Sequence, residues 1–163
     1  MNDNYDSSAD TLHHIRRVDW LLKLCAGELL QRGAVHDKTK LSNPEKETFD
    51  VYTPKLKDLV YGSPEYKACT DAMDPAIQHH YKWNSHHPQH YENGINGMDL
   101  FDLVEMLMDW KAAGERDCDG GDILRSIEIN RKKFGISDQL AQILINTAER
   151  YLLKPTDGRW RPL

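Results

Sequence analysis

The sequence concentrates its histidines in one short segment. It holds eight histidines, and five of them fall within twelve residues: His79, His80, His86, His87 and His90. Imidazole is a common ligand of transition metal ions, so this clustering points to a metal site. One or two of the five are expected to be structural and to bond backbone carbonyls. His79 or His80 would project from a helix end and converge with His86 and His87 if the following loop folds back.

A second candidate group begins with the adjacent pair His36 and Asp37 and includes Lys40 three residues later. An imidazole and a carboxylate together suit Mn, Fe, Co, Ni or Zn. Both side chains reach one cation only if the backbone turns or starts a helix there. The alternative interpretation is an aspartate helix cap with a surface histidine beside it.

Three carboxylates share one face of a predicted apolar helix. Asp102, Glu105 and Asp109 stand at i, i+3 and i+7. Buried carboxylates repel one another, so we expect arginine, lysine or a metal ion beside them. The alternative is the solvated face of an amphipathic helix.

His14 lies one turn before Val18 and flanks the apolar face of a predicted first helix. A histidine in that position, taken alone, is more often a packed residue than a ligand.

The elements that must position these residues are predicted to be helices throughout, with no convincing strand alternation and no repeat. Caps, prolines and glycines predict their limits. The first expected helix runs from the cap Asp10 to Gly33, and a second begins at Pro44. Another helix is expected after a break at Gly62-Ser63-Pro64, and the next begins at Asp74-Pro75 and ends at about Trp83. The last three are expected over 98–113, from Asp122 to Gly135, and from Ser137 to before Pro155. An ordered loop is expected over 86–97.

The prediction is therefore an all-α fold with one helical domain over residues 10–155. Residues 1–9 are expected to be a disordered head, and residues 156–163 a polar tail. The helices after residue 122 are expected to be packing elements or a homodimer surface.

Composition narrows the class of protein. The chain has 163 residues, 39% hydrophobic and 29% charged, with a net charge of −5, which is typical of a globular domain. An acidic chain is not expected to present an extended nucleic-acid-binding surface. Three cysteines without a CxxC pair favour a reducing compartment. The apolar runs are too short for a membrane span, and the start is polar, so we expect a cytoplasmic protein.

In their order along the chain, these motifs resemble the HD-domain superfamily of metal-dependent phosphohydrolases. That superfamily shows a histidine on an early helix, an adjacent His-Asp, central histidines, and a late aspartate on a buried helix. The matching segments here are His14 to Val18, His36 to Lys40 (with threonine in the usual glycine position), His79-His80, His86-His87, and Glu105 to Trp110.

More narrowly, the chain is similar to a family of phage and bacterial proteins with three motifs. These are D-T-x-x-H-I at 10–15, H-D-x-(S/T)-K-L-x-x-P-E at 36–45 and N-x-H-H-P at 84–88. The last motif is not a general superfamily feature, and the doubled histidines leave each ligand assignment open by one position. For a phage-encoded member, the expected location is the host cytoplasm.

The resemblance implies hydrolysis of a phosphate ester, with a nucleotide or similar small molecule as substrate and a metal-activated water as nucleophile. It implies one ion held by His14, His36, Asp37 and Asp109, and a second held by His80 and His86 or His87. Lys40 would contact phosphate, with Arg17, Lys82 and Arg116 as weaker candidates. Glu105 would orient a ligand histidine or act as general base.

Two other functions fit the same motifs. One is a non-catalytic protein that binds a metal and a nucleotide, or a host factor. The other is a di-iron oxygenase, because some proteins of this fold hold iron with similar ligands.

Overall fold

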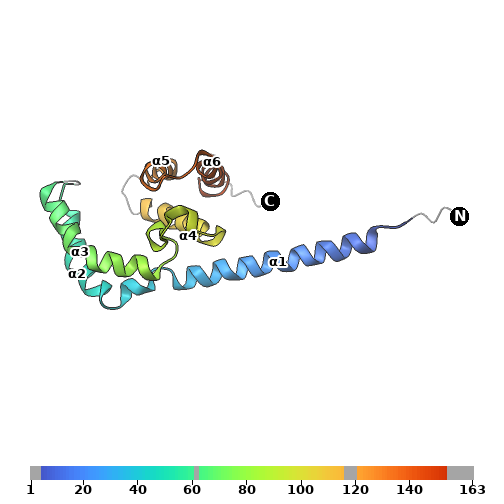
Figure 1. Cartoon of the computed structure of the whole chain (residues 1–163), viewed down its shortest axis with the longest axis horizontal. Coiled ribbons are helices and arrows are strands. Elements are labelled where there is room, and N and C mark those ends of the chain that lie inside the picture. The colour runs from blue at the N-terminus through green and yellow to red at the C-terminus, as the bar shows by residue number, and fades with distance from the viewer. Residues whose placement is uncertain (1–4, 61–62, 116–120, 154–163) are drawn as a thin grey trace. The chain divides into compact units, whose positions relative to one another are not determined.

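The computed structural model describes residues 5–60, 63–115 and 121–153, and every regular element in those ranges is helical (Figure 1). The all-α prediction is therefore confirmed. The chain divides into two compact units, Met1–His36 and Asp37–Leu163. Within the described ranges, no helix combines the length and hydropathy that a membrane span requires.

The first unit contains the long helix α1 (Ser8–Val35). Its N-cap is Ser7, three residues before the predicted cap Asp10, so residues 8 and 9 of the predicted head belong to the helix. Asp10 instead lies in the first turn, where its carboxylate favours the helix dipole. The helix also continues past Gly33, the predicted end, and His36 follows it as the C-cap. Residues 1–4 of the predicted head lie outside the described part of the chain.

The second unit begins with a turn, the short 3-10 helix η1 (Lys38–Leu41), and α2 (Glu45–Lys57). Pro44 directly precedes α2, so the predicted start differs by one residue. Next comes α3 (Pro64–Trp83), where the Ser63 hydroxyl caps the helix by accepting from the Tyr66 N–H at 3.1 Å. Helices α2 and α3 pack against each other.

The predicted helix start at Asp74-Pro75 is wrong, because Pro75 lies inside α3. A proline inside a helix removes one backbone hydrogen bond. The buried positions of α3 nevertheless continue on one face from Cys69 and Met73, before Pro75, to Ala76 and His80 after it. This continuous packing surface explains why the helix continues through the proline.

After α3 comes the predicted ordered loop, which contains the 3-10 turns η2 (Pro88–His90) and η3 (Gly94–Gly97). Helix α4 (Leu100–Gly114) follows, and its N-cap Asp99 forms a reciprocal capping box with Asp102. This helix begins two residues later than the sequence suggested.

The last described segment forms the hydrophobic core of the second unit. It comprises α5 (Ile123–Phe134), α6 (Asp138–Thr147) and the π-helical turn η4 (Ala148–Leu152), with Asp122 and Ser137 as the predicted caps. Seven buried side chains, one of them Leu107 of α4, form one cluster. They are Leu107, Ile123, Ile127, Ile136, Ala141, Leu144 and Ala148. Packing against α5 thereby fixes α4, which carries Glu105 and Asp109. Residues 154–163, which include the predicted tail, lie outside the described residues.

Candidate metal centre

Asp37 sits at a sharp turn of the backbone. Its φ of 55° and ψ of 13° place it in the left-handed region, and it is the one non-glycine residue with positive φ in the described part of the chain. Aspartate tolerates this conformation better than most residues, and such backbone strain is concentrated at functional sites. The turn that a shared His-Asp site requires is therefore present at Asp37.

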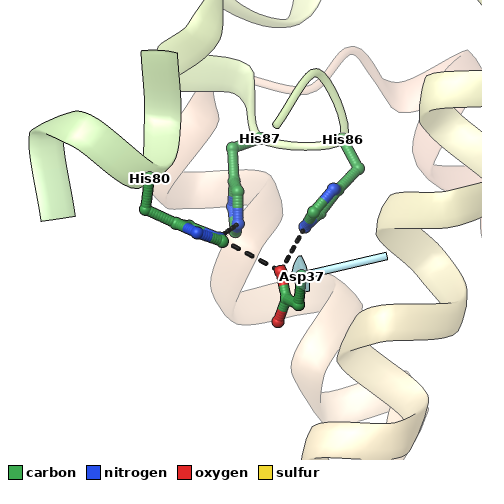
Figure 2. Close-up of side chains that lie close together, drawn as sticks. All are labelled: Asp37, His80, His86 and His87. Atoms are coloured by element: carbon green, nitrogen blue, oxygen red, sulfur yellow. Dashed lines mark hydrogen bonds and ion pairs between the residues drawn. The ribbon is translucent and has the colours of Figure 1, made fainter. Parts of the chain in front are cut away.

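The two carboxylate oxygens of Asp37 face different partners. Oδ2 lies 2.5 Å from Nζ of Lys40. Oδ1 lies 3.2 Å from Nε2 of His80 and 3.6 Å from Nε2 of His86. Figure 2 shows both imidazoles directed at the same oxygen. The lysine thus holds one oxygen while the other faces the histidines.

Three segments converge on this oxygen. Asp37 precedes η1, His80 comes from the last turn of α3, and His86 and His87 come from the loop that follows (Figure 2). Nε2 of His87 lies 2.9 Å from Nε2 of His80. The loop therefore folds back onto the helix end, as the convergence of the two histidine pairs required.

The spacing of these atoms suits one metal ion. One ligand atom from each of Asp37, His80, His86 and His87 lies within 4.8 Å of every other. Ligands about 2.1 Å from a transition metal ion are about 3.0 to 3.4 Å apart at octahedral or tetrahedral angles. The separations of 2.9, 3.2 and 3.6 Å bracket that range. Three imidazoles and one carboxylate are a donor set for a divalent transition metal, so the residues fit the ion.

His87 is held in the neutral form that a metal ligand needs. Burial, the largest cause, together with the neighbouring His86 and His80 lowers the pKa of His87 to about 3. The charges of Asp109 and Asp37 act in the opposite direction and offset only part of this effect. A neutral imidazole offers a nitrogen lone pair, whereas a protonated one offers none.

Glu105 on α4 contacts His86 from the side opposite Asp37. Its Oε1 lies 3.2 Å from Nδ1 of His86, whose side chain is 2% exposed. A carboxylate on Nδ1 favours the tautomer with the proton there and the lone pair on Nε2. This contact is the geometry expected if Glu105 orients a ligand histidine.

Glu45, the first residue of α2, was not singled out by the sequence motifs as a site residue. It is completely buried, and its carboxylate contacts His79 at 2.7 Å, His80 at 2.9 Å and the Thr39 hydroxyl at 3.0 Å. The available signal was its place at the end of the H-D-x-(S/T)-K-L-x-x-P-E motif. That motif also contains Thr39, for which the sequence indicates only a threonine in the usual glycine position and no contact with Glu45.

Asp102, the first carboxylate of the α4 stripe, is hydrogen-bonded to the loop that precedes the helix. It is 1% exposed and accepts hydrogen bonds from the hydroxyls of Ser85 (2.6 Å) and Tyr91 (2.5 Å) and from the Asp99 N–H (3.0 Å). Burial and this hydrogen bond raise the pKa of Tyr91 to about 12, so its phenol stays a donor. Asp102 thus anchors both ends of the loop segment 85–91.

The remaining candidates are placed as follows. His14 lies on α1 and His36 ends the first unit. Asp109 is half-buried on α4, close enough for its charge to raise the pKa of His87. His90 is structural, because its ring nitrogen Nδ1 lies 2.9 Å from the Tyr81 carbonyl. Of the first histidine pair, His80 faces Asp37, while His79 contacts Glu45.

The fold and the site together define a class: an all-α protein with a His/Asp cluster that could hold a metal ion. The chain matches the model of a family described as "Family of unknown function (DUF5662)" over residues 3–150, and it belongs to that family. No curated protein and no solved structure matches it.

Proposed function

We propose that this protein is a metal-dependent phosphohydrolase that acts on a nucleotide or a similar small phosphate ester. The observation that carries the proposal is the convergence of His80 and His86 on one oxygen of Asp37, with His87 beside His80 in the same cluster. The HD-domain resemblance supplies the reaction class.

Asp37, His80, His86 and His87 would hold a divalent ion such as Mn, Fe, Co, Ni or Zn. When bound, such an ion lowers the pKa of a coordinated water and neutralises charge that develops on phosphoryl oxygens. The protein's part is to offer neutral imidazoles and a fixed carboxylate, and burial keeps the His87 imidazole neutral by lowering its pKa. The pairing of Lys40 with Asp37 fixes the carboxylate.

Lys40 is the residue of this site best suited to contact a phosphate. Its side chain is 39% exposed while its ammonium group touches Asp37. The ammonium group thus combines access to solvent with a position beside the candidate metal ligands. An anionic substrate needs such a local positive group in a chain of net charge −5.

His14, His36 and Asp109 stay predictions as ligands, and with them the binding of a second ion. Glu105, which contacts His86, stays a candidate general base. The cytoplasmic location, the phage setting and a homodimer also stay predictions, as do the two other functions. Of those, the oxygenase would show an iron chromophore in the purified protein. The non-catalytic binder would retain ligand binding without turnover.

The test is hydrolysis of a panel of nucleotides and generic phosphate esters by protein loaded in turn with Mn²⁺, Co²⁺, Ni²⁺, Fe²⁺ and Zn²⁺. We expect metal-dependent release of phosphate or nucleotide product, which Asp37→Ala abolishes. Asp50→Asn is the matched control, since Asp50 is an exposed α2 carboxylate that pairs with Lys46. Absence of turnover with every loaded metal and every substrate would contradict the proposed reaction.

A further inference from the structure

The completely buried carboxylate of Glu45 contacts His80 on the side of the ring away from Asp37. We propose that Glu45 is a positioning residue that fixes the tautomer of His80, so that the Nε2 lone pair faces the metal centre. This inference rests on the proposed metal site and adds to it a residue outside the ligand set.

The contacts of Glu45 require hydrogen donors. Its Oε1 lies 2.7 Å from Nδ1 of His79, and its Oε2 lies 2.9 Å from Nδ1 of His80 and 3.0 Å from the Thr39 hydroxyl. An ionised carboxylate only accepts hydrogen bonds. Hydrogen bonds from both imidazoles to this carboxylate place the proton of each ring on Nδ1.

The Glu45 carboxylate lies where the fold favours a hydrogen-bond acceptor. Glu45 is the first residue of a 13-residue helix, where the partial positive charge of the helix N-terminus stabilises an anion. Two imidazole nitrogens and one hydroxyl surround its two oxygens, and a buried carboxylate needs such hydrogen-bond partners.

Two other polar groups lie near Nδ1 of His80, and neither replaces Glu45 as its partner. The Asn84 amide nitrogen is 3.1 Å away, but its two hydrogens are directed at the His80 carbonyl (2.8 Å) and the Thr39 hydroxyl oxygen (2.9 Å). The Thr39 hydroxyl is 3.3 Å from the same nitrogen, and its own hydrogen is directed at Glu45. Asn84 and Thr39 thus reinforce the arrangement in which His80 donates to Glu45.

The proton on Nδ1 of His80 determines what Nε2, on the other side of the ring, can do. A neutral imidazole with its proton on Nδ1 has its lone pair on Nε2. That atom lies 3.2 Å from Asp37 Oδ1 and 2.9 Å from Nε2 of His87. The opposite tautomer would direct a proton into the metal centre and an Nδ1 lone pair at the carboxylate. Glu45 therefore selects the tautomer that can ligate, as carboxylates behind metal-bound histidines do.

The first experiment determines the tautomer without any metal. Long-range ¹H–¹⁵N correlation spectra of histidine-labelled, chelator-treated protein report which nitrogen of each ring carries the proton. The His80 signal is assigned by its loss in His80→Asn. We expect the Nδ1-protonated form in the wild type and a loss of that preference in Glu45→Gln. A His80 ring protonated mainly on Nε2 in the wild type would overturn the inference.

The second experiment measures Co²⁺ affinity by titration of the wild type, Glu45→Gln and the control Glu47→Gln, an exposed carboxylate two residues further along α2. We expect binding about 10 to 100 times weaker in Glu45→Gln and unchanged in Glu47→Gln. Equal affinity in the wild type and Glu45→Gln would overturn the role of Glu45. An absence of Co²⁺ binding by the wild type would instead contradict the proposed metal site, and the tautomer result would still decide the part that Glu45 plays.

Discussion

Replacement of Asp102 by alanine is expected to loosen the loop that carries His86 and His87. The Asp102 side chain is almost completely buried and joins three groups, the Ser85 and Tyr91 hydroxyls and the Asp99 N–H. Two of these bonds link the loop segment 85–91 to α4, and the third belongs to the capping box at the start of α4. One substitution therefore removes both links and one of the two hydrogen bonds of the capping box, while the Asp102 N–H still donates to Asp99.

The cost follows from those contacts. A hydrogen bond to a charged group is worth roughly 1.5 to 3 kcal/mol. The Ser85 and Tyr91 side chains are only half-buried, so water recovers part of their loss. We therefore expect Asp102→Ala to lower the free energy of unfolding by about 3 kcal/mol, or roughly 6 to 12 °C in Tm for a chain of this size.

The assay is urea unfolding in chelator, so that bound metal does not stabilise the folded state. Tyr91→Phe, which removes one donor only, should cost about 1 kcal/mol. Asp138→Ala, at an exposed carboxylate that pairs with Arg131, should cost no more than about 1 kcal/mol. The affinity of Asp102→Ala for Co²⁺ should also fall about tenfold, because the loop must be ordered again on binding. A loss below 1 kcal/mol with unchanged affinity would refute this account of the loop.

Two further predictions concern pH and backbone geometry. The pKa of His87 is about 3 in the folded protein and about 6.5 in the unfolded chain. Below pH 6.5 the unfolded chain therefore takes up a proton that the folded chain does not. The free energy of unfolding of the metal-free protein should therefore decrease as the pH is lowered below 6.5, by at most about 1.4 kcal/mol per pH unit. His87→Asn should make the free energy of unfolding in urea less dependent on pH. A pH dependence unchanged by His87→Asn would contradict this assignment. Gly121 has φ +47°, and a Cβ there would lie 2.4 Å from the Gly114 carbonyl oxygen, so Gly121→Ala should cost about 1 to 3 kcal/mol in thermal unfolding. The control is Gly27→Ala in α1, where open space surrounds the added Cβ, and it should be neutral or stabilise the protein by up to about 1 kcal/mol. Equal effects of the two substitutions would contradict the strain at Gly121.

Local sequence signals predicted most of the fold because each acts within a few residues. Asp122 and Ser137 cap α5 and α6 as expected, since a cap needs only its own side chain and the next turn. The predicted helix start at Pro75 is wrong for the same reason. Whether α3 continues through Pro75 depends on packing against α2, which the local sequence pattern does not contain.

The site was predictable in part. The His-Asp pair and the doubled histidines identified Asp37 and the convergent segments, and α4 supplied Glu105. The choice between His79 and His80 depends on where α2 places Glu45, a contact across 35 positions of sequence. Charge periodicity on α4 also could not show that Asp102 accepts from the Ser85 and Tyr91 hydroxyls, because these two residues come from the preceding loop.

The most direct test of the metal centre is elemental analysis by plasma mass spectrometry of the purified, untagged protein beside Asp37→Ala and Asp50→Asn. The account predicts about one or two equivalents of a transition metal in the wild type and Asp50→Asn, and loss of that metal in Asp37→Ala. A wild-type protein that holds no metal after loading with each candidate ion would contradict the metal centre, and so would an Asp37→Ala variant that retains the full amount.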